Sequence, residues 1–382
     1  MHDFVPLSVP NLKGRELELV SQAIETEWVS TGGPYIPEFE EKISRYIGVE
    51  DAVAVQSGTA GLHLAYKEVG ITAEDMVIVP DLTFMGTLNP VAYIGAEPVF
   101  IDCDDSLCID TAKIRRFCEG ECRIDNGALF HLATGKRVRA VVAVHIFGNI
   151  CDMKEIVDIA DEFHLKVVED ATESLGSYYV SGQYMGKHAG TIGDIAVLSF
   201  NGNKIITTGG GGMIIAKDSE ALEHMRYLSR QSKNDELRFI HDEIGYNYRM
   251  TNLQAALGIA QLEQLDRFIE TKKRNYEIYL EEGLNLLPFK EDISPNYWFY
   301  SLMTSGHRYI LMEELTKRNI QSRPIWELMH LLKPFKDSLT YEIERAPYYH
   351  AEIVNIPCST NLDEGTARYV AGEIKNILGQ LQ

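Results

Sequence analysis

The sequence predicts an α/β fold, and three features of the chain lead to this class. Short apolar segments typical of buried strands alternate with segments of helical periodicity through the first half of the chain. The strand segments lack polar alternation, so we expect a mostly parallel sheet that is covered by helices on both faces. The chain has 382 residues, which is long for one hydrophobic core and favours two domains.

The predicted elements follow one another from residue 52 onward. Strands are expected at residues 52–55, 77–80, 98–101, 138–144, 166–168 and 195–198, and helices at 60–69 and 87–94. Gly70 ends the first of these helices, because glycine is a poor helix former. Open α/β sheets bind ligands beyond the carboxyl ends of their strands, and several polar candidate residues follow these strands.

Two later regions complete the predicted organisation. The stretch 117–137 interrupts the alternation, and residues 123–129 and 131–137 within it are expected to form a small inserted hairpin, with Asn126-Gly127 as its turn. From Thr251, which is suited to cap a helix, the pattern is helical. We therefore place a large domain at residues 1–250, and a long connecting helix with a small C-terminal α/β domain at residues 251–382.

Composition and charge exclude several classes of protein. The formal net charge of −20 argues against a nucleic-acid surface, and an anionic substrate would need local positive groups. No apolar run reaches bilayer length, and the first twenty residues do not read as a signal peptide. The six cysteines lack metal-ligand spacing and fit reduced thiols. We expect a cytoplasmic protein without a metal, membrane or nucleic-acid partner.

Lys204 is the most informative candidate residue. It follows the strand predicted at 195–198 and precedes a run of four glycines, residues 209–212. A lysine amine that is partly desolvated at the edge of a sheet can lose its proton and add to a carbonyl as a Schiff base. With an acid for a pyridinium nitrogen and a phosphate cradle upstream, this lysine indicates a pyridoxal 5′-phosphate (PLP) site.

Candidates for the other parts of such a site follow other strands. Asp170 ends a buried strand and can keep a pyridine nitrogen protonated, although an aspartate at such a position, taken alone, is usually a helix N-cap. The segment Ser57-Gly58-Thr59-Ala60 closes a strand and opens a helix, whose free N–H groups can hold a phosphate. Ser199 can add a hydroxyl to this cradle. Phe84 can stack on the ring or belong to the core.

These and other segments stand in a characteristic order along the chain. They are Ser57 to Ala60, Thr83-Phe84, Val144-His145, Gly148, Asp152-Met153, Glu169 to Ala171, Gly193-Asp194, Ser199-Phe200, Lys204, Thr207 to Gly209 and Gly245 to Met250. In this order they resemble the DegT/DnrJ/EryC1 family of PLP-dependent sugar aminotransferases, and the resemblance covers nearly the whole chain.

The resemblance implies the aspartate-aminotransferase fold (PLP-dependent fold type I), with a mostly parallel sheet of the seven-stranded type in the large domain. It also implies a homodimer with active sites at the subunit interface. It makes Lys204 the Schiff-base lysine and Asp170 the partner of the ring nitrogen. The other implied cofactor-binding residues are Gly58, Thr59, Ala60 and Ser199 at the phosphate, Phe84 over the ring, Glu173 at the phenolic oxygen, and Asn247, which reaches the phosphate bound by the partner subunit.

Three positions depart from the commonest family pattern. Asn201 replaces a frequent histidine, Gly210 a frequent glutamate, and Glu173 a glutamine or histidine that often contacts the phenolic oxygen. All required chemical groups remain, so these changes bear on cofactor tuning and substrate preference. Residues 170–176 and the inserted hairpin are similar to enzymes of the legionaminic acid and bacillosamine branch, which aminate C4 of a nucleotide-linked 4-keto-6-deoxy-N-acetylhexosamine.

The resemblance implies an enzyme that transfers an amino group to C4 of such a sugar. The donor in this family is usually L-glutamate. The expected acceptor is UDP-4-keto-6-deoxy-N-acetylhexosamine, and the expected pathway is bacterial surface-glycan biosynthesis. Both substrates would use one site in turn, which predicts ping-pong kinetics. The residues expected to bind substrate are Thr31, Gly32, Arg230 and His330. Arg230 would hold a donor carboxylate or a diphosphate, and a solvated surface role is the equal alternative for a lone arginine.

Two other functions stay open. PLP-dependent sugar dehydratases resemble this chain but carry histidine in place of the Schiff-base lysine, so Lys204 argues against dehydration. A non-catalytic regulatory relative is the second alternative. No helix-turn-helix pattern or basic patch supports it, and such a protein would not need Lys204 and Asp170.

Overall fold

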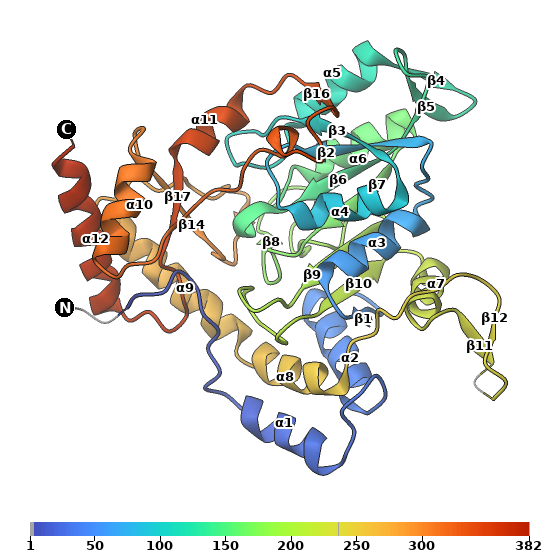
Figure 1. Cartoon of the computed structure of the whole chain (residues 1–382), viewed down its shortest axis with the longest axis horizontal. Coiled ribbons are helices and arrows are strands. Elements are labelled where there is room, and N and C mark those ends of the chain that lie inside the picture. Colours follow the sequence, from blue (N-terminus) through green and yellow to red (C-terminus); the bar gives the residue numbers. More distant parts are fainter. Residues whose placement is uncertain (1–3, 236, 382) are drawn as a thin grey trace.

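A computed structural model describes residues 4–235 and 237–381, and it is built around one large sheet with helices on both faces (Figure 1). Most neighbouring strands are parallel, so the predicted α/β class is confirmed. The strands lie in the order β1 (Val53–Val55), β10 (Gly212–Ala216), β9 (Ile195–Ser199), β7 (Lys166–Asp170), β6 (Arg137–Val144), β2 (Asp75–Pro80), β3 (Glu97–Ile101) and β16 (Leu339–Tyr341).

The seven strands from β1 to β3 in this order form the expected seven-stranded core of the sheet. Strand β10 runs antiparallel to β9 and β1, and the sequence prediction lacks it. It begins at Gly212, the last residue of the glycine run, so the sequence at its start is typical of a loop. Strand β16 from the C-terminal part extends the sheet beside β3.

The inserted hairpin extends the same sheet. Its strands β4 (Cys122–Asp125) and β5 (Ala128–His131) are joined by Asn126-Gly127, both with positive φ, as a tight hairpin turn requires. Strand β5 pairs with β6, which attaches the hairpin to the sheet. Phe117, at the start of the interrupting stretch, lies on helix α5 (Thr111–Glu121), which precedes the hairpin.

The two faces of the sheet bury different sets of helices. Helices α3 (Gly58–Glu68), α4 (Met85–Ile94) and α7 (Ser219–Ser229) pack on one face, and α5, α6 (Met153–Phe163) and α2 (Tyr35–Ile47) contribute to the clusters on the other. Successive residues of a strand enter opposite clusters; Val141 and Val142 of β6 are an example. Because both faces are covered, the strands carry no polar alternation.

The connection to the C-terminal part consists of two helices. Helix α8 (Asn252–Leu262) is capped by Thr251, as predicted, in a capping box with Gln254. Helix α9 (Leu265–Glu281) follows after a short break, so the prediction of a single long helix is wrong. Helix α8 packs against α1 (Glu16–Glu25) and α2.

The C-terminal part has its own small sheet. It consists of β14 (Tyr300–Met303), β17 (Ile353–Ile356) and β15 (Arg323–Pro324), and helices α9, α10 (Arg308–Lys317), α11 (Arg345–Glu352) and α12 (Glu364–Gly379) accompany it. The N-terminal segment lies beside it, because Val5 bridges to Ile320 and Leu7 accepts the N–H of Cys358 (Figure 1). This segment and β16 both cross the predicted division at residue 250, which stays a prediction.

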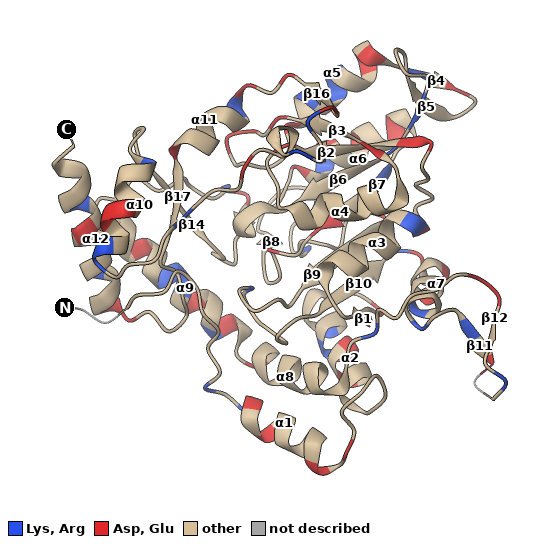
Figure 2. Ribbon diagram, viewed as in Figure 1, with Lys and Arg blue, Asp and Glu red and all other residues tan. Residues whose placement is uncertain are grey.

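Two short pairs of strands complete the fold: β8 (Tyr178–Tyr179) with β13 (Ile293–Ser294), and β11 (Lys233–Asp235) with β12 (Ile240–His241). The β11–β12 hairpin projects from the body of the molecule (Figure 1). Acidic and basic residues are scattered over the outer elements in this view (Figure 2). Within the described part of the chain, no helix combines the length and apolar character needed to cross a bilayer.

Helix α3 approaches the sheet closely at Gly61. A Cβ atom at Gly61 would lie 2.7 Å from Cγ1 of Val197 on β9. We expect Gly61→Ala to lower the free energy of unfolding by about 1–3 kcal/mol, because overpacking a rigid neighbour outweighs the better helix propensity of alanine. Urea denaturation measures this change.

Gly120 on α5 provides the matched control, since a Cβ atom there would meet nothing within 4 Å. Gly120→Ala should raise the free energy of unfolding by up to about 1 kcal/mol. Equal shifts in the two variants would contradict the close approach of α3 to β9.

Candidate active site

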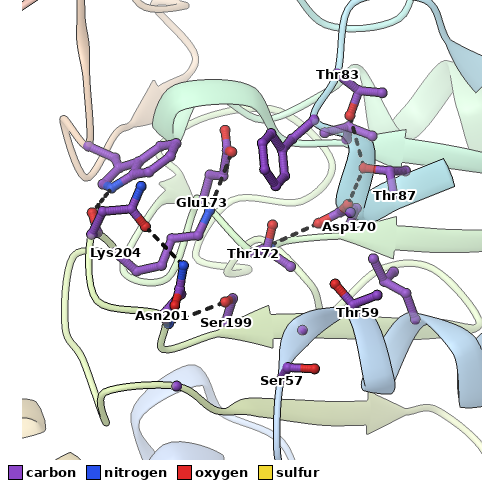
Figure 3. A pocket seen from close by; sticks show the side chains of 18 of the residues that line it. Ser57, Thr59, Thr83, Thr87, Asp170, Thr172, Glu173, Ser199, Asn201 and Lys204 are labelled. Carbon is purple, nitrogen blue, oxygen red and sulfur yellow. Dashed lines mark hydrogen bonds and ion pairs between the residues drawn. The ribbon is translucent and has the colours of Figure 1, made fainter. Parts of the chain in front are cut away.

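A cavity of about 300 Å³ opens at the carboxyl ends of the parallel strands. Seven of the predicted site residues line it: Gly58, Thr59, Phe84, Asp170, Glu173, Ser199 and Lys204. They come from segments far apart in the chain and converge because the ends of β7 and β9 and the start of α3 meet there (Figure 3). The volume lies within the range of small-molecule sites in proteins.

Lys204 enters the cavity from the loop that follows β9. Its backbone N–H donates to the carbonyl of Asn201 at 3.0 Å. Its Nζ lies 3.4 Å from Oε1 of Glu173 (Figure 3), and it lies 4.1 Å from the centre of the Trp298 ring. The amine is therefore largely withdrawn from water and is held by a carboxylate and an aromatic face.

Glu173 is buried next to this amine. Its Oε2 accepts the backbone N–H of Phe147 at 2.9 Å. Burial raises the pKa of Glu173 to about 7, against the opposing effect of the Lys204 charge. Near neutral pH, this carboxyl can therefore take up or release a proton beside the lysine.

The raised pKa of Glu173 predicts a pH-dependent stability of the cofactor-free protein. The folded state binds this proton more tightly than the unfolded state, so the stabilisation is complete below the usual pKa of 4.5 and is lost as the pH rises through about 7. The loss is on the order of 3 kcal/mol. Melting temperatures of wild type and Glu173→Gln, measured from pH 4 to pH 8, test this prediction. A constant difference between the two proteins over that interval would contradict it.

Asp170 ends strand β7 as a buried carboxylate, with 3% of its surface exposed. Its Oδ2 accepts the hydroxyl of Thr87 at 2.7 Å, and Oδ1 accepts the N–H of Thr172 at 3.2 Å (Figure 3). No lysine, arginine or histidine of the described chain lies within ion-pair distance of it. A buried carboxylate is expensive without a positive partner, so Asp170 is suited to a cationic group of a ligand. The N-cap alternative fails, because turns and not a helix follow Asp170.

The start of helix α3 forms the floor of the cavity. Ser57 caps the helix, and its Oγ accepts the N–H of Ala60 at 3.1 Å. Ala60 itself does not line the cavity. The preceding N–H groups of Gly58 and Thr59 have no partner within the helix and can bind an anion. A Cβ atom at Gly58 would lie 3.1 Å from Cβ of Ser199, so glycine permits this close arrangement.

Several aromatic side chains complete the walls. Phe84 is 56% exposed and lies 5.6 Å from the Trp326 ring, so it is not a core residue. Trp298, Phe299 and Trp326 come from the C-terminal part and line the cavity. These three residues and Thr87 are not among the site residues predicted from the sequence. Thr87 lies in the first turn of α4, three residues beyond its N-cap Phe84, and could have been found from this spacing.

Five further predicted residues lie outside this cavity. Arg230 and Asn247 are exposed and face each other in an antiparallel bridge next to the β11–β12 hairpin. Thr31 and Gly32 belong to the loop between α1 and α2. His330 is held by Asp81, with Nδ1 2.7 Å from Oδ2. The structure of one chain therefore does not bring these residues to Lys204.

The residues that line the cavity fit PLP. The unpaired carboxylate of Asp170 suits a protonated ring nitrogen, the start of α3 with Ser199 suits the phosphate, and Lys204 suits the aldehyde. Phe84 can lie against the ring. Each chemical group that this cofactor requires is present in one cavity.

Several known proteins are similar to this chain over most of its length. A sequence profile described as the DegT/DnrJ/EryC1/StrS aminotransferase family matches residues 10–375. The chain is 36% identical over 339 residues to the GDP-perosamine synthase of Escherichia coli O157:H7, covering 87% of this chain and 88% of that enzyme. It is 27% identical over 393 residues to the UDP-4-amino-4,6-dideoxy-N-acetyl-beta-L-altrosamine transaminase of Campylobacter jejuni, covering 99% and 98%.

A solved structure shares the fold along the whole chain. The aminotransferase TlmJ from Streptoalloteichus hindustanus superimposes with a TM-score of 0.89 at 25% identity, and all of both chains is covered. This similarity confirms the fold type that the family resemblance implies.

Proposed function

Because the chain belongs to the DegT/DnrJ/EryC1/StrS aminotransferase family, we propose that it transfers an amino group from L-glutamate to C4 of a nucleotide-linked 4-keto-6-deoxy sugar. As a member of this family the protein is a PLP-dependent transaminase. The observation that carries the proposal is the convergence of Lys204 and Asp170 in one cavity. A non-catalytic relative would need neither group there.

The mechanism follows from what these side chains can do. When bound, PLP supplies an aldehyde that reacts with amines and a ring that withdraws electrons from the reacting carbon. Asp170 would hold the ring nitrogen of this cofactor protonated. Lys204 Nζ, within reach of Glu173, moves protons to and from the carbon that gains or loses nitrogen. The Trp298 and Phe84 rings restrict water around these atoms.

The proposed acceptor is defined by two details: the carbon that receives the amine, and the nucleotide that carries the sugar. The name of the Campylobacter jejuni relative specifies a 4-amino-4,6-dideoxy sugar carried on UDP, and the Escherichia coli relative is named for a GDP-linked product. Both names support a nucleotide sugar as the acceptor. We propose UDP-4-keto-6-deoxy-N-acetylhexosamine as the acceptor, used in surface-glycan biosynthesis, with the GDP-linked 4-keto-6-deoxy sugar as the alternative.

Incubation of the holoenzyme with glutamate and each of these two keto sugars tests the proposal. We expect stoichiometric 2-oxoglutarate and a 4-amino sugar, identified by mass spectrometry and NMR. Loss of water from the sugar without formation of 2-oxoglutarate would favour a dehydratase. No product from either sugar would reject the proposed acceptor class.

We also propose a homodimer with shared active sites. The β11–β12 hairpin and the segment after it expose Leu237, Phe239 and Ile244 at 86%, 67% and 84%, and a group of exposed apolar side chains marks a contact surface. The adjoining Asn247 and Arg230 would reach the partner's cavity, with Asn247 at its phosphate and Arg230 at a substrate anion.

Mixing inactive variants tests the shared site. Lys204→Ala and Asn247→Ala homodimers should recover activity after subunit exchange, because one site of each mixed dimer combines an intact lysine with an intact asparagine. Failure to recover activity, in mixtures shown by native mass spectrometry to contain the mixed dimer, would argue for sites within single subunits.

Thr31, Gly32 and His330 are proposed to border the sugar. A rise in the KM for the keto sugar, with an unchanged KM for glutamate, is the expected effect of Thr31→Val and His330→Ala. We propose that the enzyme acts in the cytoplasm, since all six cysteines are buried free thiols. Fractionation of the native cells would test this location.

A further inference from the structure

A second cavity, of about 560 Å³, adjoins the active-site cavity. The two share Asn203, Phe299 and Trp326 as lining residues, so the second lies directly behind the aromatic wall of the first. The N-terminal residues Leu7 and Ser8 and the small C-terminal sheet form its other sides. We call this space the annexe.

A buried arginine without an anionic partner lines the annexe. Arg308 is 5% exposed, and its Nη1 has no hydrogen-bond partner among the described residues. Its Nη2 donates to the hydroxyl of Tyr309 at 2.7 Å, and its guanidinium lies 4.6 Å from the centre of that ring. A guanidinium stays charged when it is buried, so a missing anion leaves its charge uncompensated.

A second arginine lines the same space. Arg323 on β15 donates from Nη1 only to the neighbouring carbonyl of Ser322, at 3.1 Å. No carboxylate in residues 4–235 or 237–381 lies within 4.0 Å of the guanidinium of Arg308 or Arg323. Glu327 also lines the annexe, but it pairs with His350 at 3.2 Å. The annexe therefore carries the buried guanidinium of Arg308 and the exposed guanidinium of Arg323, and neither contacts a carboxylate of the described chain.

Apart from the start of α3, which can bind a phosphate, the active-site cavity has few groups that can bind an anion. The charged side chains of the described chain that line it are Asp170, Glu173 and Lys204, and Lys204 is required for the cofactor. The net charge of the protein is −20. Glutamate carries two carboxylates and a nucleotide sugar carries a diphosphate, so either substrate needs a local positive site.

We propose that the annexe is a substrate subsite in which Arg308 and Arg323 bind an anionic oxygen group, either a carboxylate of the amino donor or the diphosphate of the nucleotide sugar. The inference rests on the proposed function for the identity of the substrates. Planar guanidinium groups suit both kinds of oxyanion, because each can donate two parallel hydrogen bonds.

Calorimetric titration of the PLP-bound enzyme with 2-oxoglutarate, and separately with UDP and GDP, tests the subsite. Arg308→Gln and Arg323→Gln should weaken binding of the relevant probe by about 10- to 100-fold, the effect of losing a charged hydrogen bond. Weaker binding of 2-oxoglutarate alone assigns the carboxylate, and weaker binding of a nucleotide alone assigns the diphosphate. Unchanged binding of all three probes in both variants would overturn the proposal.

Two controls separate binding from folding. Arg318→Gln removes an arginine of the same small domain that is already paired with Glu314 and Glu373, and it should leave all affinities unchanged. Arg308→Lys keeps the buried charge and should restore part of the affinity if Arg308→Gln folds poorly. Absence of sugar amination by the wild type would reject the proposed function. The binding titrations do not depend on turnover, so they test the annexe separately.

Discussion

Replacing Lys204 by alanine is expected to reduce transamination by a factor of about 10⁴ or more, because the variant loses both the covalent attachment point and the side chain that moves protons. The amine lies in the cavity beside Glu173 and Trp298, where no other lysine of the described chain lines the wall. The variant should also lack the yellow absorbance that wild type shows with PLP. Spectra and single-turnover rates with glutamate measure the two effects.

Lys187→Ala is the matched control, since this lysine is exposed and does not line the cavity. It should retain both the absorbance and the rate of wild type. Borohydride reduction of the holoenzyme followed by peptide mapping should label position 204. A label on a different lysine would refute the assignment of the site.

The cavity residues that were predictable from the sequence are those that lie directly after a strand. Asp170 and Lys204 follow buried strands, and parallel strands bring their carboxyl ends to one edge of a sheet. The start of α3 was predictable for the same reason, with Ser57 as its cap. Periodicity and end signals are local, so they can be read from a short stretch of sequence.

The aromatic wall was not predictable, because it depends on long-range packing. Trp298 reaches the lysine because its indole Nε1 donates to the carbonyl of Asn203, at 2.7 Å. The buried Lys272 supports the same segment by donating to the Trp298 carbonyl at 3.0 Å. A single sequence gives no sign of such contacts, since an isolated tryptophan is consistent with any core.

Strand β10 was missed for a related reason, and the pairing of the N-terminal segment was equally hidden in the sequence. The strand begins in a glycine run, and only its pairing with β9 and β1 on both sides makes it a strand. The N-terminal segment bridges to Ile320, more than three hundred residues later. Residues such as Asn247, expected to act in the partner subunit, also require information that lies outside one chain.

Asp170→Asn is expected to lower the turnover rate by about 10²- to 10³-fold, which is the usual effect of removing a preorganised electrostatic partner. The amide is nearly isosteric and can still accept the hydroxyl of Thr87, so the cavity should keep its shape. It cannot hold a positive charge on a ring nitrogen, and the electron-withdrawing power of the cofactor depends on that charge.

The exposed Asp218, which caps α7, provides the control because Asp218→Asn keeps a good N-cap. Its rate should equal that of wild type. In Asp170→Asn, by contrast, the half-reaction with glutamate should slow while PLP remains bound through Lys204, which stopped-flow absorbance can follow directly. A wild-type rate in Asp170→Asn would mean that the buried carboxylate serves only to anchor Thr87 and Thr172 at the end of β7. The positively charged partner of this buried carboxylate would then be a group other than the ring nitrogen of PLP.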